Sequence, residues 1–159
     1  YQIEPMLELA GDAMEWIEFA ALLHDIGHHI SHKNHHLHTY YLILHGELLG
    51  FESEALRVIA LVARYHRKGT PRDTDADVAV LSPAHRSTVR ALAAVLRIAD
   101  ALDRSHYSIV RDVTVEKTPE QLRICVHTNG EAAELEMWEA QRRCGLLAEI
   151  VDQPVEFFL

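Results

Sequence analysis

The chain has 159 residues, 48% of them hydrophobic, which is enough for one real core with at most a small appended unit. No apolar run approaches the ~18 residues of a membrane span, and a net charge of −9 argues against general nucleic-acid binding, DNA included. The two cysteines, Cys125 and Cys144, fit neither a disulfide framework nor a zinc ribbon. We therefore expect a cytoplasmic protein with no membrane partner.

The first half of the chain predicts helices. Apolar residues at helical spacing predict a helix over 5–27, which Gly27 would end. The histidine-rich stretch HHISHKNHHLH that follows, 28–38, is polar and predicts a loop. A second helix is predicted over 39–49, and a third begins at Ser53.

The centre of the chain carries the longest predicted helix. The segment RYHRKGTPR, with its glycine and proline, ends the third helix. The stretch DTDADVAVLSPAHRST predicts a loop with a short turn. The longest helix then runs from about Pro83 or Ser87 to Leu102, and it is rich in alanine, leucine and arginine.

The spacing of the apolar residues changes after residue 107, from helical spacing to alternation. SIVRDVTVE and QLRICVHT alternate apolar and polar residues and predict a hairpin. A helix is predicted over 134–150, and PVEFFL predicts a last strand. The fold class is therefore α+β, a mainly α-helical domain over 1–107 and a small β-β-α-β domain over 108–159.

Three residues at the ends of apolar helical runs could hold a metal. LLHDIG places His24 beside Asp25, and LRIADALD places Asp100 among apolar residues, where an unpaired carboxylate would cost several kcal/mol. An imidazole and two carboxylates suit a divalent metal that grips phosphate oxygens and acidifies a water. The alternative to metal binding is that His24 and Asp25 form a hydrogen-bonded pair at the surface, at a capped helix end. Asp100 would then form an ion pair with Arg97 or Arg104.

The centre of the chain is basic although the whole is acidic. Residues 57–111 carry nine arginines and one lysine against five acids, which predicts a local anion site. Five cationic or ionisable residues lie within nine positions at the end of the third helix. Some of these residues can be explained as caps of the helix C-terminus or as part of a solvated helix face. However, the paired N–H groups of an arginine guanidinium also suit phosphate oxygens. We predict that these residues bind substrate: Arg64, His66, Arg67, Lys68 and Arg72.

These motifs together resemble a known family. AALLHDIGHHISHKNHHLHTYYLI, ALVARYHRKGTPR and LRIADALDRSHYSIV are similar to the C-terminal region of the exopolyphosphatase and guanosine pentaphosphate phosphatase (Ppx/GppA) family. LLHDIGHHI followed by LRIADALD also resembles the HD superfamily of metal-dependent phosphohydrolases. The resemblance covers most of residues 15–115, and it implies an HD-like helical bundle that lacks its first helix.

The resemblance also implies roles for individual residues. His24, Asp25 and Asp100 match the HD metal ligands, for Mg²⁺, Mn²⁺ or another divalent metal. His28 lies where HD enzymes place a basic group beside the substrate phosphate, which makes it the candidate catalytic residue. His66 lies where they often have a further histidine. An HD site needs one more histidine a helix upstream, and we expect it before Tyr1 in a longer protein.

Three functions follow from the resemblance. The first is the substrate-holding and dimerising portion of an exopolyphosphatase-type hydrolase that acts on polyphosphate or guanosine pentaphosphate. Terminal phosphates would then be cleaved, with Mg²⁺, in N-terminal actin-like domains of the same polypeptide. The second is a self-contained HD phosphohydrolase that acts on nucleotide phosphoesters. The third is a non-catalytic dimerisation module with a degenerate metal site.

Overall fold

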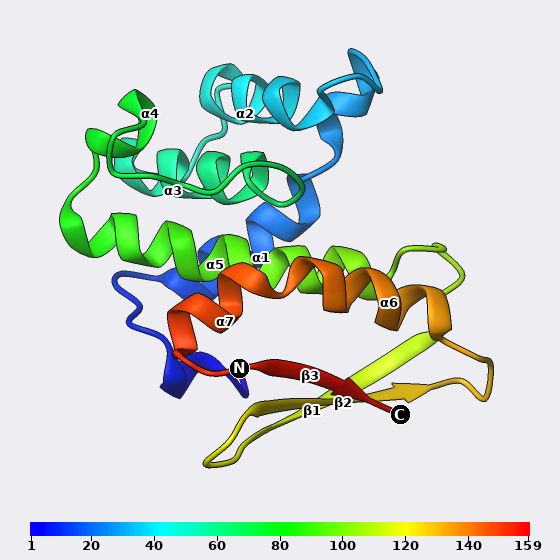
Figure 1. Cartoon of the computed structure of the whole chain (residues 1–159). Coiled ribbons are helices and arrows are strands. Elements are labelled where there is room, and N and C mark those ends of the chain that lie inside the picture. The colour runs from blue at the N-terminus through cyan, green and yellow to red at the C-terminus, as the bar shows by residue number, and fades with distance from the viewer. The chain divides into compact units, whose positions relative to one another are not determined.

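The computed structural model describes residues 1–159, which divide into two compact units. One unit is formed by residues 8–96, and the other by residues 1–7 together with 97–159. Helices and one three-stranded sheet give the α+β fold that the sequence predicts (Figure 1). The predicted domains, 1–107 and 108–159, stay a prediction. None of the helices combines the length and apolarity that crossing a membrane demands.

The unit of residues 8–96 is built around one buried helix. Its elements are α1 (Ala13–Leu23), the 3₁₀ helix η2 (Ile26–His29), α2 (His35–His45), α3 (Ser53–Arg64), α4 (Ala76–Ala79) and the first part of α5 (Pro83–Leu102). Six consecutive residues of α3, 58–63, are fully buried. A helix that is apolar all round must be enclosed, and α1 and α2 both pack against α3 (Figure 1). The end of α3 therefore emerges from the core at a fixed place.

The predicted helix over 5–27 is wrong at both ends. Gly11 has a φ of +64°, which lies in the left-handed region. A Cβ atom there would lie 2.3 Å from the Trp16 ring, so the chain turns at Gly11 and α1 begins only at Ala13. At the other end α1 stops at Leu23, and a 3₁₀ turn follows it.

The histidine-rich stretch 28–38 is not all loop, because its last four residues belong to α2. Asn34 has a φ of +59°, and α2 begins directly after it at His35. The helix ends at His45, so the predicted helix over 39–49 is shifted by four residues at each end. The predictions of α3 and α5 are confirmed, since both begin and end close to the expected positions.

The second unit contains the small sheet. β1 (Val110–Lys117) and β2 (Leu122–Thr128) form the predicted hairpin, and β3 (Val155–Phe158) pairs parallel to β2, in the order β1-β2-β3. α6 (Glu134–Arg143) and α7 (Gly145–Val151) pack against β3 (Figure 1). The single helix predicted over 134–150 is therefore wrong in one respect, because Cys144 divides it into two. A short 3₁₀ helix, η1 (Glu4–Met6), completes this unit.

The loop after α3 is tied down by a tyrosine. The hydroxyl of Tyr65 donates to Asp75 Oδ2 at 2.8 Å. Burial and this hydrogen bond raise the pKa of Tyr65 to about 12, against about 10 in an unfolded chain. The fold thus favours the neutral phenol, which contributes stability that is complete below pH ~10 and is lost as the pH rises through the folded pKa.

We expect Tyr65→Phe to lower the free energy of unfolding at pH 7 by about 1 kcal/mol, since the hydrogen bond to Asp75 is lost. The variant should also lose the tyrosinate absorbance that develops near pH 12 in an alkaline titration. Urea unfolding and ultraviolet difference spectra measure the two effects. Tyr107→Phe is the control, because Tyr107 is exposed, and a wild-type titration curve from Tyr65→Phe would contradict the assignment.

Candidate metal centre

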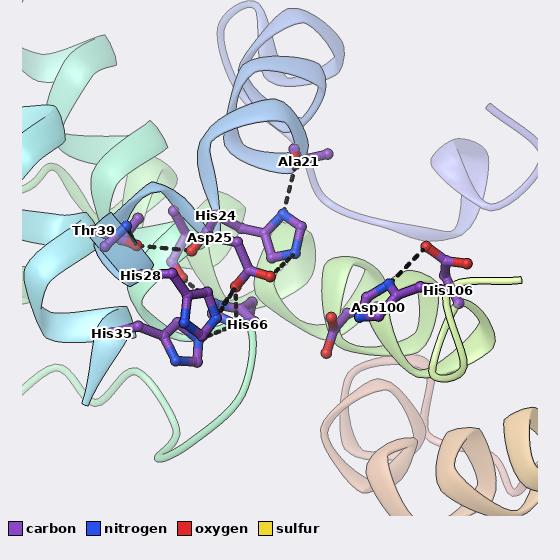
Figure 2. Close-up of polar contacts among 12 residues, drawn as sticks. Ala21, His24, Asp25, His28, His35, Thr39, His66, Asp100 and His106 are labelled. Atoms are coloured by element: carbon purple, nitrogen blue, oxygen red, sulfur yellow. Dashed lines mark hydrogen bonds and ion pairs between the residues drawn. The ribbon is translucent and has the colours of Figure 1, made fainter. Parts of the chain in front are cut away.

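Four histidines surround the carboxylate of Asp25 in the unit of residues 8–96 (Figure 2). Asp25 Oδ2 lies 3.5 Å from Nε2 of His24. Asp25 Oδ1 lies 3.5 Å from Nε2 of His28 and 3.3 Å from Nε2 of His35. The fourth imidazole is that of His66, with Nε2 at 3.7 Å from the same oxygen. Residues from three separate helical segments therefore meet at one carboxylate.

The turn after α1 is fixed against α2 by Thr39 and Gly27. The Thr39 hydroxyl donates to the carbonyl of His24 at 2.8 Å and accepts from the Gly27 N–H at 3.0 Å (Figure 2). A Cβ atom at Gly27 would lie 2.1 Å from the carbonyl oxygen of His35, so no larger residue allows this approach. The contact brings His24 and Asp25 to the first turn of α2.

Three of the four imidazoles are oriented by the backbone. Nδ1 of His24, His35 and His66 each faces the carbonyl oxygen of the residue three positions earlier, at 2.6, 3.4 and 2.5 Å. A carbonyl only accepts, so the short contacts of His24 and His66 favour a proton on Nδ1 and the lone pair of the neutral ring on Nε2. Metal-ligating histidines show this same outer hydrogen bond.

Two buried Nε2 atoms face each other in this cluster. Nε2 of His35 lies 3.2 Å from Nε2 of His66, and both side chains are 2% exposed. Burial lowers the pKa of His35, and the nearby His28 lowers it further. Two lone pairs at this distance repel unless a cation or a proton lies with them. Either a shared proton or a cation satisfies the two nitrogens, and the two groups His24, Asp25, His66 and Asp25, His28, His35 have the donor atoms that a divalent metal ion takes.

The predicted cations at the end of α3 fall into two groups. Arg64 is partly buried and pairs with Asp77 Oδ2 at 2.6 Å, with its guanidinium 5.0 Å from the centre of the Tyr40 ring. The charge of Arg64 is therefore already paired with a carboxylate of the same unit. In contrast, Arg67, Lys68 and Arg72 are exposed at the surface.

Two of the exposed cations, Arg67 and Lys68, act electrostatically on histidines at the start of α2. His36 is the second residue of α2, and its pKa is lowered by burial first and then by the charges of His35, Lys68 and Arg67. Arg67 is also among the charges that lower the pKa of His35. Both cations are thus close enough to be felt by the imidazoles, and the surface beside the cluster favours an anion.

The comparison with known families agrees with this chemistry. Residues 2–142 match the family described as Ppx/GppA phosphatase, domain III. The chain belongs to the Ppx/GppA phosphatase family. The resemblance that the sequence motifs predicted is confirmed, and the family's chemistry is the hydrolysis of phosphate groups.

Within this Ppx/GppA domain, the predicted metal ligands lie in both units. His24 and Asp25 are together, as expected. Asp100 belongs to the unit of residues 97–159, where its carboxylate pairs with Arg143 of α6. Its predicted role as a ligand stays a prediction. Arg143 was not among the ion-pair partners that the sequence suggested for Asp100, which were Arg97 and Arg104.

Sequence reasoning did not single out His35, and it gave His66 two possible roles. His66 was predicted to bind substrate and also matches the further histidine of HD enzymes. Its ring is buried against Asp25 and His35, and its role stays a prediction. His35 was placed in a loop, so its direction could not be inferred. The available signal was its position directly after Asn34, a residue that tolerates the left-handed conformation and so can precede a helix.

Thr39→Val should remove both hydrogen bonds that hold the turn after α1. The buried Gly27 N–H is then left without an acceptor, so we expect a loss of about 1–3 kcal/mol in the free energy of unfolding. The imidazole ¹⁵N resonances of His24 and His28 should also shift. Urea unfolding and heteronuclear NMR measure the two effects, and Thr39→Ser, which keeps the hydroxyl, should recover most of both.

Thr88→Val is the matched control, because Thr88 is equally buried in the same unit. Its hydroxyl donates to Ala84 at 3.1 Å and accepts from the Ala10 N–H at 2.9 Å. This control should lose stability but leave the imidazole resonances in place. Unchanged His24 and His28 resonances in Thr39→Val would show that the hydroxyl does not organise the cluster.

Proposed function

We propose that this chain is the phosphate-holding region of an exopolyphosphatase-type hydrolase that acts on polyphosphate or guanosine pentaphosphate. Cleavage of the terminal phosphate is assigned to actin-like domains in the N-terminal part of the same polypeptide. Homodimerisation through this region is part of the proposal and rests on the family alone. The observation that carries the proposal is the convergence of four imidazoles on Asp25, in the unit that also presents Arg67 and Lys68.

The metal ligands of this proposal are His24 and Asp25, with Asp100 as the resemblance implies. A divalent metal held there would supply positive charge to non-bridging phosphate oxygens and lower the pKa of a bound water. The outer hydrogen bond from His24 Nδ1 to the Ala21 carbonyl directs the lone pair of the neutral ring to Nε2, the atom that faces Asp25. The exposed carboxylate of Asp25, 40% accessible, leaves that side of the cluster open to solvent.

The second contribution comes from the exposed cations. Arg67 offers a planar fork to two phosphate oxygens, and Lys68 adds a compact point charge next to it. A phosphate chain carries a negative charge on every unit, so cations adjacent in sequence can contact successive units. Arg64, which is already paired with Asp77, would act mainly by holding the end of α3 in place.

The double variant Arg67→Ala/Lys68→Ala should bind long-chain polyphosphate more weakly than the wild type. A variant that makes fewer phosphate contacts releases fewer counterions on binding. The magnitude of the slope of log K against log[salt] should therefore fall by roughly one to two. Isothermal titration at several salt concentrations measures both. The control is Arg111→Ala/Lys117→Ala, which removes the same charge from β1 in the other unit.

Equal weakening by the two double variants would mean that net charge, not this surface, governs binding. Affinity that does not change in Arg67→Ala/Lys68→Ala would leave these residues with a capping role only. Guanosine pentaphosphate, titrated in parallel, tells whether a long chain is required.

A second function, a self-contained phosphohydrolase, is favoured by one observation on His28. Its Nδ1 is buried without a hydrogen-bond partner, unlike Nδ1 of the other three imidazoles. No backbone carbonyl fixes its tautomer, so the proton can occupy either nitrogen, as a general acid requires. On this proposal His28 acts as the general acid that donates a proton to the leaving oxygen of a nucleotide phosphoester.

If the second function holds, the metal-supplemented chain should hydrolyse a chromogenic phosphodiester, and His28→Ala should lower kcat by about 100-fold or more. The stoichiometry of bound metal should persist in the variant, which separates proton transfer from metal binding. No turnover by the wild type would leave the holding function alone.

A further inference from the structure

We propose that residues 1–7 form a strap that closes the outer edge of β1 through the side-chain amide of Gln2, and that release of this strap opens the edge to pairing with a second copy of the chain. The strap and the sheet belong to the unit of residues 1–7 and 97–159, whereas Arg67 and Lys68 belong to the other unit. The inference therefore goes beyond the proposed function and does not depend on it.

The amide of Gln2 occupies two backbone groups on the outer edge of β1. The sheet has the order β1-β2-β3, so the side of β1 that faces away from β2 is an edge. Gln2 Nε2 donates to the Val113 carbonyl at 2.8 Å, and the Val115 N–H donates to Gln2 Oε1 at 2.7 Å. A side-chain amide offers a donor and an acceptor, as a peptide group does. Gln2 therefore takes the place of a neighbouring strand at this position.

Other side chains occupy further backbone groups at the sheet edges. The Val113 N–H donates to Asp112 Oδ1 at 2.8 Å, so three successive outward groups of β1 are paired with side chains. On β3, at the opposite edge, Gln141 Nε2 donates to the Val155 carbonyl at 3.0 Å. An unpaired edge strand is a template for another chain, most of all where it is rich in valine and phenylalanine. Side-chain closure of both outer strands therefore protects a sheet that would otherwise associate.

Gln2 is the part of this closure that can open. None of residues 1–7 is fully buried, and η1 contributes no residue to the core. A segment with few buried contacts opens locally at a low cost in free energy. Asp112, in contrast, bonds to the residue next to it in the chain, so its contact survives when the strap leaves. Release of the strap thus exposes the Val113 carbonyl and the Val115 N–H together.

The charges of β1 favour a second copy as the occupant of the open edge. Two β1 strands paired antiparallel about Val113 place Asp112 opposite Thr114, and no like charges face each other across the pair. Pairing about Thr114 would instead place Asp112 opposite Glu116. One register is therefore compatible with self-pairing, and it is symmetric about a two-fold axis, as a closed dimer requires.

Gln2→Met, made in the full chain, keeps the size of the side chain and removes both hydrogen bonds. At low protein concentration the Val115 amide should exchange with solvent roughly two- to tenfold faster, the factor that corresponds to one ordinary hydrogen bond. At higher concentration, sedimentation velocity should show a species larger than any that the wild type forms. Hydrogen exchange is followed by NMR. Gln121→Met is the control, because Gln121 bonds to Thr118 through its backbone at the turn between β1 and β2.

A second substitution tests whether the β1 edge carries the association. Gln2→Met/Val115→Pro removes an outward N–H that a new strand needs and leaves the ladder to β2 intact, so it should sediment like the wild type. If circular dichroism shows that this variant is unfolded, Gln2→Met/Thr114→Asp serves instead, because it opposes a second carboxylate to Asp112 of the other copy.

Three results would overturn the inference. Val115 exchange that is unchanged in Gln2→Met would show that the amide does not close the edge. Faster exchange without a larger species would show that the open edge does not pair with a second copy. A larger species that persists in the double variants would place the association on another surface.

Discussion

The close approach of the turn after α1 to the first turn of α2 is the contact on which the site depends. It is possible only because Gly27 has no side chain, and it is held by the Thr39 hydroxyl, which bonds to both His24 and Gly27. A polar group buried at such a contact must be paired, and here one hydroxyl pairs two backbone groups at once. Two segments separated by a polar loop are thereby held in register, and their imidazoles converge.

The electrostatics of the site divide into an inner and an outer part. Inside, burial lowers the pKa of His35 and of His36, which favours the neutral imidazole in both rings. Outside, Arg67 and Lys68 keep their charge in contact with solvent. A phosphate chain would therefore meet the positive charges of Arg67 and Lys68 at the surface. The neutral imidazoles beneath them would attract phosphate strongly only if they held a cation.

Local patterns made part of this structure predictable. The apolar run of α3, the long α5 and the alternating hairpin are each determined within one segment, and the motif HDIG located His24 and Asp25. The start of α2 was hidden because the buried His35 and His36 count as polar in any pattern. The meeting of His35 with His66, 31 residues apart, and of Asp100 with Arg143, 43 residues apart, depends on tertiary packing that no local spacing encodes.

The ion pair of Asp100 changes the weight of the original metal argument. That argument began from the cost of a carboxylate among apolar residues, which requires a partner of opposite charge. Arg143, itself fixed by Glu139 at 2.7 Å, supplies such a partner within the same unit, so burial alone no longer requires a metal at Asp100. Asp25, in the other unit, has four imidazoles within 3.7 Å of its carboxylate. The need for an ion is therefore greatest beside Asp25, and it is there that the chemistry of this domain should be sought.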